Sequence, residues 1–71
     1  MNKVLSRFKD VKPGTKFLDK LGNDYYFETV NEDGAIFIDS VNGWLIQVNN
    51  LWAEKGKIDF YKYDILRNLA K

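Results

Sequence analysis

The sequence contains no histidine and no cysteine, and it has a single proline. The absence of the first two residue types excludes disulfide bonds, thiol chemistry, imidazole acid–base catalysis and most transition-metal sites. The sequence also lacks a run of eighteen apolar residues, so we expect no membrane-spanning segment. Residues 1–8 show no apolar signal-peptide core, so we expect a cytoplasmic protein. We also expect that the protein needs no cofactor.

The chain is instead rich in aromatic side chains, with 5 Phe, 4 Tyr and 2 Trp among 71 residues. Hydrophobic residues make up 45% and charged residues 30%, a balance typical of a folded domain rather than a disordered tail. A chain of this length forms one domain, residues 1–71, and must build its core without disulfides or metals. The aromatic rings supply the apolar area for such a core.

The formal net charge of +1 conceals an uneven distribution of charge. Residues 1–20 carry a net charge of +4, residues 21–54 carry −6, and residues 55–71 carry +3. Either the basic ends fold back on the acidic centre and neutralise it, or the molecule has one electropositive and one electronegative face. The sequence leaves both arrangements open.

Short runs of β-forming residues alternate with turn signals, which predicts a mainly β protein. We expect five antiparallel strands within a β core that spans residues 15–63, forming a small barrel or a strongly bent sheet. The expected strands cover residues 15–19, 24–30, 35–39, 44–48 and 57–63.

Three segments outside these strands have helical signals. Apolar spacing predicts a short helical turn in a basic lead-in, residues 1–12, and a C-terminal helix over residues 64–71. Residues 49–56 indicate one further helical turn, because they begin with asparagine and end with glycine.

The Asn42-Gly43 pair predicts a two-residue hairpin turn that opposes Phe37 to Val48. A four-residue loop before residue 35 then opposes Glu28 to Phe37. One face of the sheet is expected to carry Tyr26, Val30, Phe37, Ile46 and Val48, and the other Tyr25, Phe27, Ile36, Ile38 and Leu45. Because neither face is polar, something must cover the second: the terminal helices, as we expect, or else a partner or a second copy of the chain.

The order of five short strands with tight hairpins and a helical turn before the last resembles an SH3-like small barrel over residues 15–63. The Pro-Gly pair at 13–14, ahead of a β run, is similar to the lead into a first barrel strand. Peptide-binding SH3 domains carry an acidic, aromatic-rich first loop, which residues 20–23 do not supply, so proline-peptide binding is not implied. Size and composition resemble small accessory proteins of bacteriophages and other mobile elements.

An enzymatic function is not expected. Glu28 and Asp39, on one face of adjacent strands, are the nearest approach to a catalytic pair. Such residues at strand edges are typically solvated or paired with lysine, and a small barrel has little room for a substrate pocket. We therefore assign no catalytic, cofactor-binding or metal-binding residues.

Two binding functions remain. In the first, the protein is an interaction module, in the manner of a phage accessory or inhibitor protein acting on a host protein, with aromatic anchors and an acidic surface. Its candidate residues are Tyr25, Trp52, Tyr61, Tyr63, Glu28, Glu32 and Asp33. Trp52 is the ring that strand packing explains least.

In the alternative, the protein is a nucleic-acid-binding small barrel, whose basic ends hold phosphates while Tyr61 or Tyr63 stacks on bases. Its candidate phosphate ligands are Lys3, Arg7, Lys9, Lys12, Lys55, Lys57 and Lys62. Arginine occurs only twice, and the pI of about 7.9 is low for a dedicated nucleic-acid-binding protein. The sequence therefore favours a protein partner.

Overall fold

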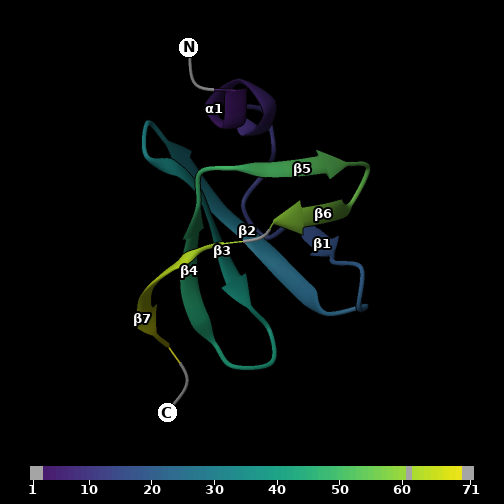
Figure 1. Cartoon of the computed structure of the whole chain (residues 1–71), viewed down its shortest axis with the longest axis vertical. Helices are drawn as coiled ribbons and strands as arrows, with labels where there is room; N and C mark the ends of the chain where they lie inside the picture. The colour runs from purple at the N-terminus through teal and green to yellow at the C-terminus, as the bar shows by residue number, and fades with distance from the viewer. Residues whose placement is uncertain (1–2, 61, 70–71) are drawn as a thin grey trace.

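A computed structural model describes residues 3–60 and 62–69. Within these residues the chain forms one short helix and a seven-stranded sheet (Figure 1). The elements are α1 (Lys3–Phe8), β1 (Lys16–Leu18), β2 (Asp24–Asn31), β3 (Gly34–Asp39), β4 (Trp44–Val48), β5 (Leu51–Glu54), β6 (Lys57–Phe60) and β7 (Asp64–Asn68). The mainly β class and the N-terminal helical turn are confirmed.

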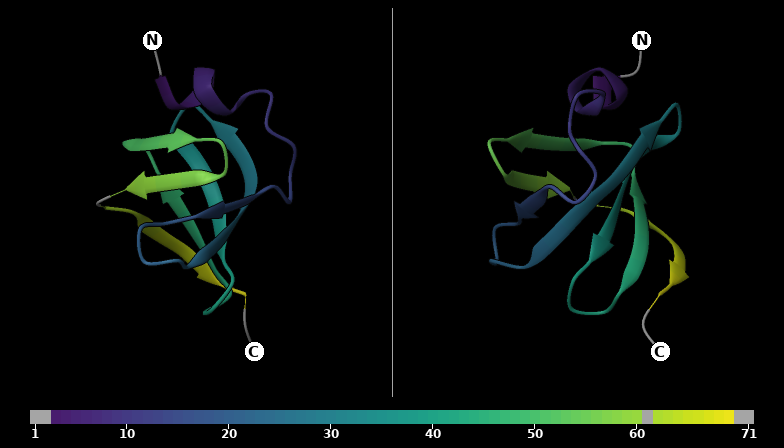
Figure 2. Two further views of the ribbon diagram at one scale, coloured as in Figure 1. Left: turned by 90° about the vertical axis from the view of Figure 1, so that its right-hand side faces the viewer. Right: turned by 180° about the vertical axis from the view of Figure 1, so that it is seen from behind.

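The sheet runs in the order β5-β6-β1-β2-β3-β4-β7, so β5 and β7 form its two edges. Neighbouring strands of the sheet pair antiparallel, except that β1 and β6 pair in parallel. The expectation of a wholly antiparallel sheet of five strands is therefore wrong for the described part of the chain. The strands wrap around one core, with the β5–β6 hairpin crossing over the β2–β3–β4 meander (Figure 2).

Phenylalanine rings fill this core. The Phe8 ring of α1 lies 5.4–5.6 Å from those of Phe17, Phe27 and Phe37, measured between ring centroids. Phe8 is 1% exposed, and Val4 of the same helix is also buried. The lead-in is thus part of the core, because α1 closes one end of the curled sheet with its apolar face.

A β-bulge in β2 decides which aromatic rings are buried. Val30 opposes Ala35 as expected, but the register shifts between Phe27 and Thr29, so that Phe27, not Glu28, opposes Phe37. One inserted residue moves every side chain before it to the other face. Tyr25 and Phe27 are buried as a result, and Tyr26 is exposed, which reverses the expected placement of these three residues.

The β3–β4 hairpin is also longer than a two-residue turn. Phe37 opposes Ile46 rather than Val48, a register shift of two residues. Asp39 causes the difference, because its carboxylate accepts hydrogen bonds from the amides of Val41 and Asn42 and holds a wider loop. A shift of two preserves the faces, so Phe37, Ile46 and Val48 still point into the core.

Two expected helices are strands. Leu51–Glu54, within the expected helical turn at 49–56, pairs with β6, because alternation turns Leu51 and Ala53 toward the core. Asp64–Asn68, within the expected C-terminal helix at 64–71, pairs with β4. Its spacing of Ile65, Leu66 and Leu69 suits a helix, but the free hydrogen-bonding edge of β4 outweighs that preference. The described part of the chain therefore has no C-terminal helix to cover the outer sheet face.

Candidate functional site

A groove of about 540 Å³ lies between the β1–β2 turn and the β5–β6 hairpin. We call it the Trp52 groove. It is lined by Leu18, Asp19, Lys20, Gly22, Trp52, Lys57, Ile58 and Asp59. The parallel pairing of β1 with β6 creates it, by setting Leu18 directly opposite Lys57.

Trp52 is exposed because strand alternation requires it. Its neighbours Leu51 and Ala53 pack against the core, so the indole of Trp52 turns to the opposite side of β5, where it is 49% exposed. Leu18, at 38% exposure, adds a second apolar side chain to the groove. A half-exposed tryptophan beside an aliphatic side chain is the type of surface that anchors a binding partner.

Charged side chains of both signs form the rim. Lys20 Nζ lies 3.2 Å from Asp59 Oδ2 across the groove, and Asp59 stands directly opposite Trp52 in the β5–β6 ladder. Lys57 lies on the same face of β6, two residues before Asp59. The rim therefore offers a donor and an acceptor within reach of any group that contacts Trp52.

Asp19 fixes the shape of the β1–β2 turn. Its carboxylate accepts hydrogen bonds from the amides of Leu21 and Asn23, at 2.8 and 2.9 Å, and from the Tyr25 hydroxyl at 3.2 Å. Burial raises the pKa of Asp19, but these bonds and that from the Asn23 side chain outweigh burial and hold the pKa below its ordinary value. The turn is therefore preformed next to the groove.

The hydrogen bond to Asp19 also affects the pKa of the Tyr25 hydroxyl. Burial, followed by the nearby Asp19 charge and its hydrogen bond, raises the pKa of the Tyr25 hydroxyl. At 7% exposure, Tyr25 is a core residue, and its expected role as a surface anchor is wrong.

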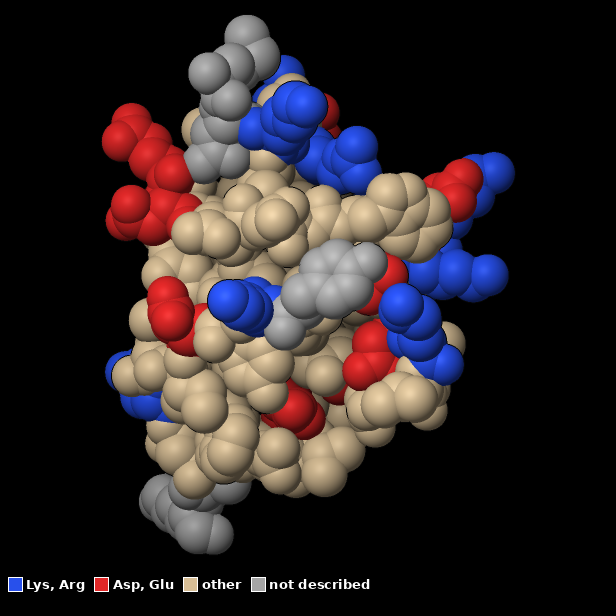
Figure 3. Space-filling model, in the orientation of Figure 1, with Lys and Arg blue, Asp and Glu red and all other residues tan. Residues whose placement is uncertain are grey.

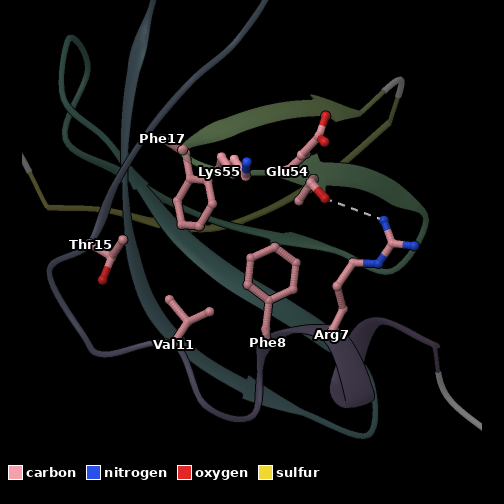
Figure 4. Close-up of a pocket in the computed structure, with 9 residues that line it drawn as sticks. Arg7, Phe8, Val11, Thr15, Phe17, Glu54 and Lys55 are labelled. Atoms are coloured by element: carbon pink, nitrogen blue, oxygen red, sulfur yellow. Dashed lines mark hydrogen bonds between the residues drawn. The ribbon is translucent and has the colours of Figure 1, made fainter.

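A second hollow of about 270 Å³ lies between α1 and the β5–β6 turn (Figure 4). We call it the Arg7 hollow. Figure 4 shows the rings of Phe8 and Phe17 next to each other and tilted, with Arg7 to the right of them and Lys55 above them. The guanidinium of Arg7 donates a hydrogen bond of 3.4 Å to the carbonyl of Ala53 on β5.

Tyr63, Glu28, Glu32 and Asp33 are not among the described residues that line the Trp52 groove. Tyr63 is 42% exposed and packs edge-on against Phe60, with ring centroids 5.4 Å apart. Tyr61 lies outside the described residues. The exposed Glu32 and Asp33 form the tip of the β2–β3 hairpin, and Glu28 is exposed at the bulge.

Charged side chains are distributed unevenly over the folded surface. Acidic side chains gather over the tip of the β2–β3 hairpin, whereas basic and acidic side chains mix along the β5–β6 side (Figure 3). The expected phosphate ligands Lys3, Arg7, Lys9, Lys12, Lys55, Lys57 and Lys62 are all exposed. Of these, Arg7 and Lys55 share the Arg7 hollow and Lys57 lines the Trp52 groove.

Sequence reasoning missed Leu18, Lys20 and Asp59 as groove residues. Leu18 and Lys20 lie near Trp52 because of the β1–β6 pairing, and parallel pairing between distant segments has no local signal in the sequence. Asp59 instead opposes Trp52 within the β5–β6 hairpin, and it was missed because residues 49–56 were expected to be helical.

Within residues 3–60 and 62–69, no group of three acidic side chains is placed to hold a metal ion. The helix in this same part of the chain is too short and polar to cross a bilayer. Comparison of the chain with protein-family models, curated proteins and solved structures finds no match.

Proposed function

We propose that the protein is a small non-enzymatic interaction module that binds a polypeptide segment in the Trp52 groove. The observation that carries this proposal is the half-exposed indole of Trp52 in a groove of about 540 Å³. That volume lies within the range of about 300–1,000 Å³ found for ligand sites. The resemblance to SH3-like barrels stays a prediction about the fold, and the resemblance to phage accessory proteins stays a prediction about the partner.

The groove suits a peptide with one large apolar side chain flanked by polar groups. An apolar side chain that covers Trp52 and Leu18 gains by removing both from water. Lys57 and the Lys20–Asp59 pair at the rim then orient the neighbouring peptide groups, because each presents a charge next to the apolar surface. The apolar contact with Trp52 and Leu18 provides the affinity, and the charged side chains of the rim fix the position of the peptide along the groove.

A random peptide library displayed on phage tests this proposal. Peptides are selected on the immobilised wild-type protein, without depletion on any variant, and the enriched peptides are measured by fluorescence polarisation. We expect Trp52→Ala to weaken binding by about 30-fold, as truncation of an interface tryptophan commonly does. Tyr26→Ala is the matched control, because Tyr26 is a 37% exposed ring outside the groove.

Tryptophan fluorescence locates the contact directly. A Trp44→Phe variant leaves Trp52 as the sole indole, since the chain contains two tryptophans. Binding in the groove shifts Trp52 emission to the blue as its surroundings lose water. Peptides that bind Trp52→Ala and wild type equally, without a spectral shift, would refute the proposal.

Nucleic-acid binding is the second candidate, and one observation favours it. The fold brings Arg7 and Lys55, from the two basic ends of the chain, to the rim of the same hollow. The measurement is the polarisation of a fluorescent oligothymidine at rising salt, with an Arg7→Gln/Lys55→Gln variant for comparison. Affinity that falls steeply with salt, and further in the variant, supports this function. An absence of binding at low salt excludes it.

A further inference from the structure

The two edges of the sheet differ in how they are covered. At β5, Arg7 of α1 reaches the strand and donates a hydrogen bond of 3.4 Å to the carbonyl of Ala53 (Figure 4). At β7, no described element packs on the outer side, and all five residues, Asp64–Asn68, are exposed. An uncovered edge strand presents unpaired backbone groups that pair readily with another strand.

The uncovered β7 edge is also apolar. Ile65 is 51% exposed and Leu66 is 45% exposed. Leu69, at 41%, follows the strand, and its amide bonds to the carbonyl of Gly43 at the base of the loop that carries the 74% exposed Val41. Large apolar side chains therefore extend along this edge into the β3–β4 loop.

Two opposite charges on β7 share one face of the sheet. Asp64 opposes Gln47 and Arg67 opposes Leu45 in the ladder to β4. Gln47 and Leu45 are two residues apart, so they point to the same face, and opposed residues of an antiparallel pair share a face. Asp64 and Arg67 therefore also lie on this face. They are three residues apart, which would place them on opposite faces of a regular strand, but the register shift between Leu45 and Ile46 returns them to the same face.

We propose that the β7 edge pairs antiparallel with the β7 edge of a second copy, forming a two-fold symmetric dimer. A two-fold axis between residues 65 and 66 sets the Asp64 of each copy opposite the Arg67 of the other, and Ile65 opposite Leu66. The edge is thus complementary to itself in both charge and apolarity, as a two-fold interface requires.

This dimer is independent of the proposed function. The Trp52 groove lies on the β1, β5 and β6 side of the sheet, and β7 is the edge opposite to β5. Both grooves stay open in the dimer, which makes the assembly bivalent. A monovalent peptide should bind wild type and monomeric variants alike, so failure of one proposal is distinguishable from failure of the other.

Light scattering after size exclusion, from about 5 µM to about 500 µM of the full chain, measures the association. We expect the mass to rise with concentration from 8.3 kDa toward twice that value. Asp64→Lys and Arg67→Glu should each weaken the dimer by about tenfold or more, because each change replaces two attractions with two repulsions. Asp33→Lys is the control, an exposed charge change at the β2–β3 tip.

Charge exchange provides the decisive comparison. Mixing the Asp64→Lys and Arg67→Glu variants should restore association, since each chain then meets its opposite charge in the other. The Asp64→Lys/Arg67→Glu double variant should also associate as a homodimer. Far-UV circular dichroism of every variant confirms that it is folded.

Three outcomes would overturn the proposal. The first is a wild-type protein that stays monomeric at about 500 µM. The second is a dimer that both single variants leave unchanged, which would place the interface elsewhere. The third is a monomer whose selected peptides lose binding on Leu66→Asp, because the edge would then accept a foreign strand rather than a second copy.

Discussion

Replacing Phe8 by alanine tests whether α1 is an integral part of the folded unit. The helix spans only Lys3–Phe8, and a helix of six residues is not stable by itself in water. Its attachment depends on Phe8, whose ring is 1% exposed and lies against those of Phe17, Phe27 and Phe37. Loss of this ring should release α1 and with it the Arg7 contact to β5.

The expected loss of unfolding free energy is about 3–5 kcal/mol, the cost of truncating a fully buried phenylalanine. A domain of 71 residues has a total unfolding free energy of about 4–11 kcal/mol. Phe8→Ala should therefore remove a large part of the stability of the protein. In urea, where the slope is about 1 kcal/mol per molar for a small domain, the midpoint should fall by about 3 M or more.

The assay is urea titration at neutral pH, followed by far-UV circular dichroism and by tryptophan fluorescence. Leu21→Ala is the control, because Leu21 is 87% exposed and its truncation should change the unfolding free energy by less than about 0.5 kcal/mol. A loss below about 1 kcal/mol for Phe8→Ala would show that α1 is an appended arm. That result would refute the packing described for the core.

Three further variants test local features. Gly34→Ala should lower the melting temperature by several degrees or prevent folding, because Gly34 has a φ of 137° and an added Cβ would collide with the carbonyl oxygen of Val48. Lys55→Asn should stabilise the protein by about 0.5–1 kcal/mol in a urea titration, because Lys55 has a φ of 40°, where asparagine is better tolerated. Asp19→Asn should be less stable than wild type at pH 7, with the difference shrinking below about pH 4. The folded state lowers the pKa of Asp19, so its contribution is present above the ordinary carboxyl pKa and is lost as pH falls through the folded value. A pH-independent difference in urea midpoint would contradict this role.

Most strand positions could be predicted from local patterns. The β runs around Phe27, Phe37 and Ile46 are rich in β-forming residues, and the turns beside them contain glycine or asparagine. The same reasoning failed at Asp64–Asn68, because the apolar spacing of Ile65, Leu66 and Leu69 favours a helix. Pairing with a distant strand decided that case, and the sequence carries no local signal of it.

In the candidate site, too, only some residues could be predicted from the sequence. Trp52 was identifiable as the ring that strand packing explains least, and it lines the groove with 49% of its surface exposed. Tyr25 was placed on the wrong face, because the bulge at Glu28 reverses the alternation before it. Leu18 could not be assigned, since its position beside Trp52 depends on the parallel β1–β6 pair. Asp59 was missed because residues 49–56 were expected to form a helical turn, whereas they contain β5, which sets Trp52 opposite Asp59.

The sequence by itself determined the mainly β class, the N-terminal helical turn and the dependence of the core on aromatic rings. These follow from local propensity and composition, because histidine and cysteine are absent and phenylalanine is abundant. Only the tertiary structure decided strand number, register, the Trp52 groove and the two unlike edges. Each of these depends on pairing between segments far apart in the chain, where one inserted residue exchanges the buried and exposed faces.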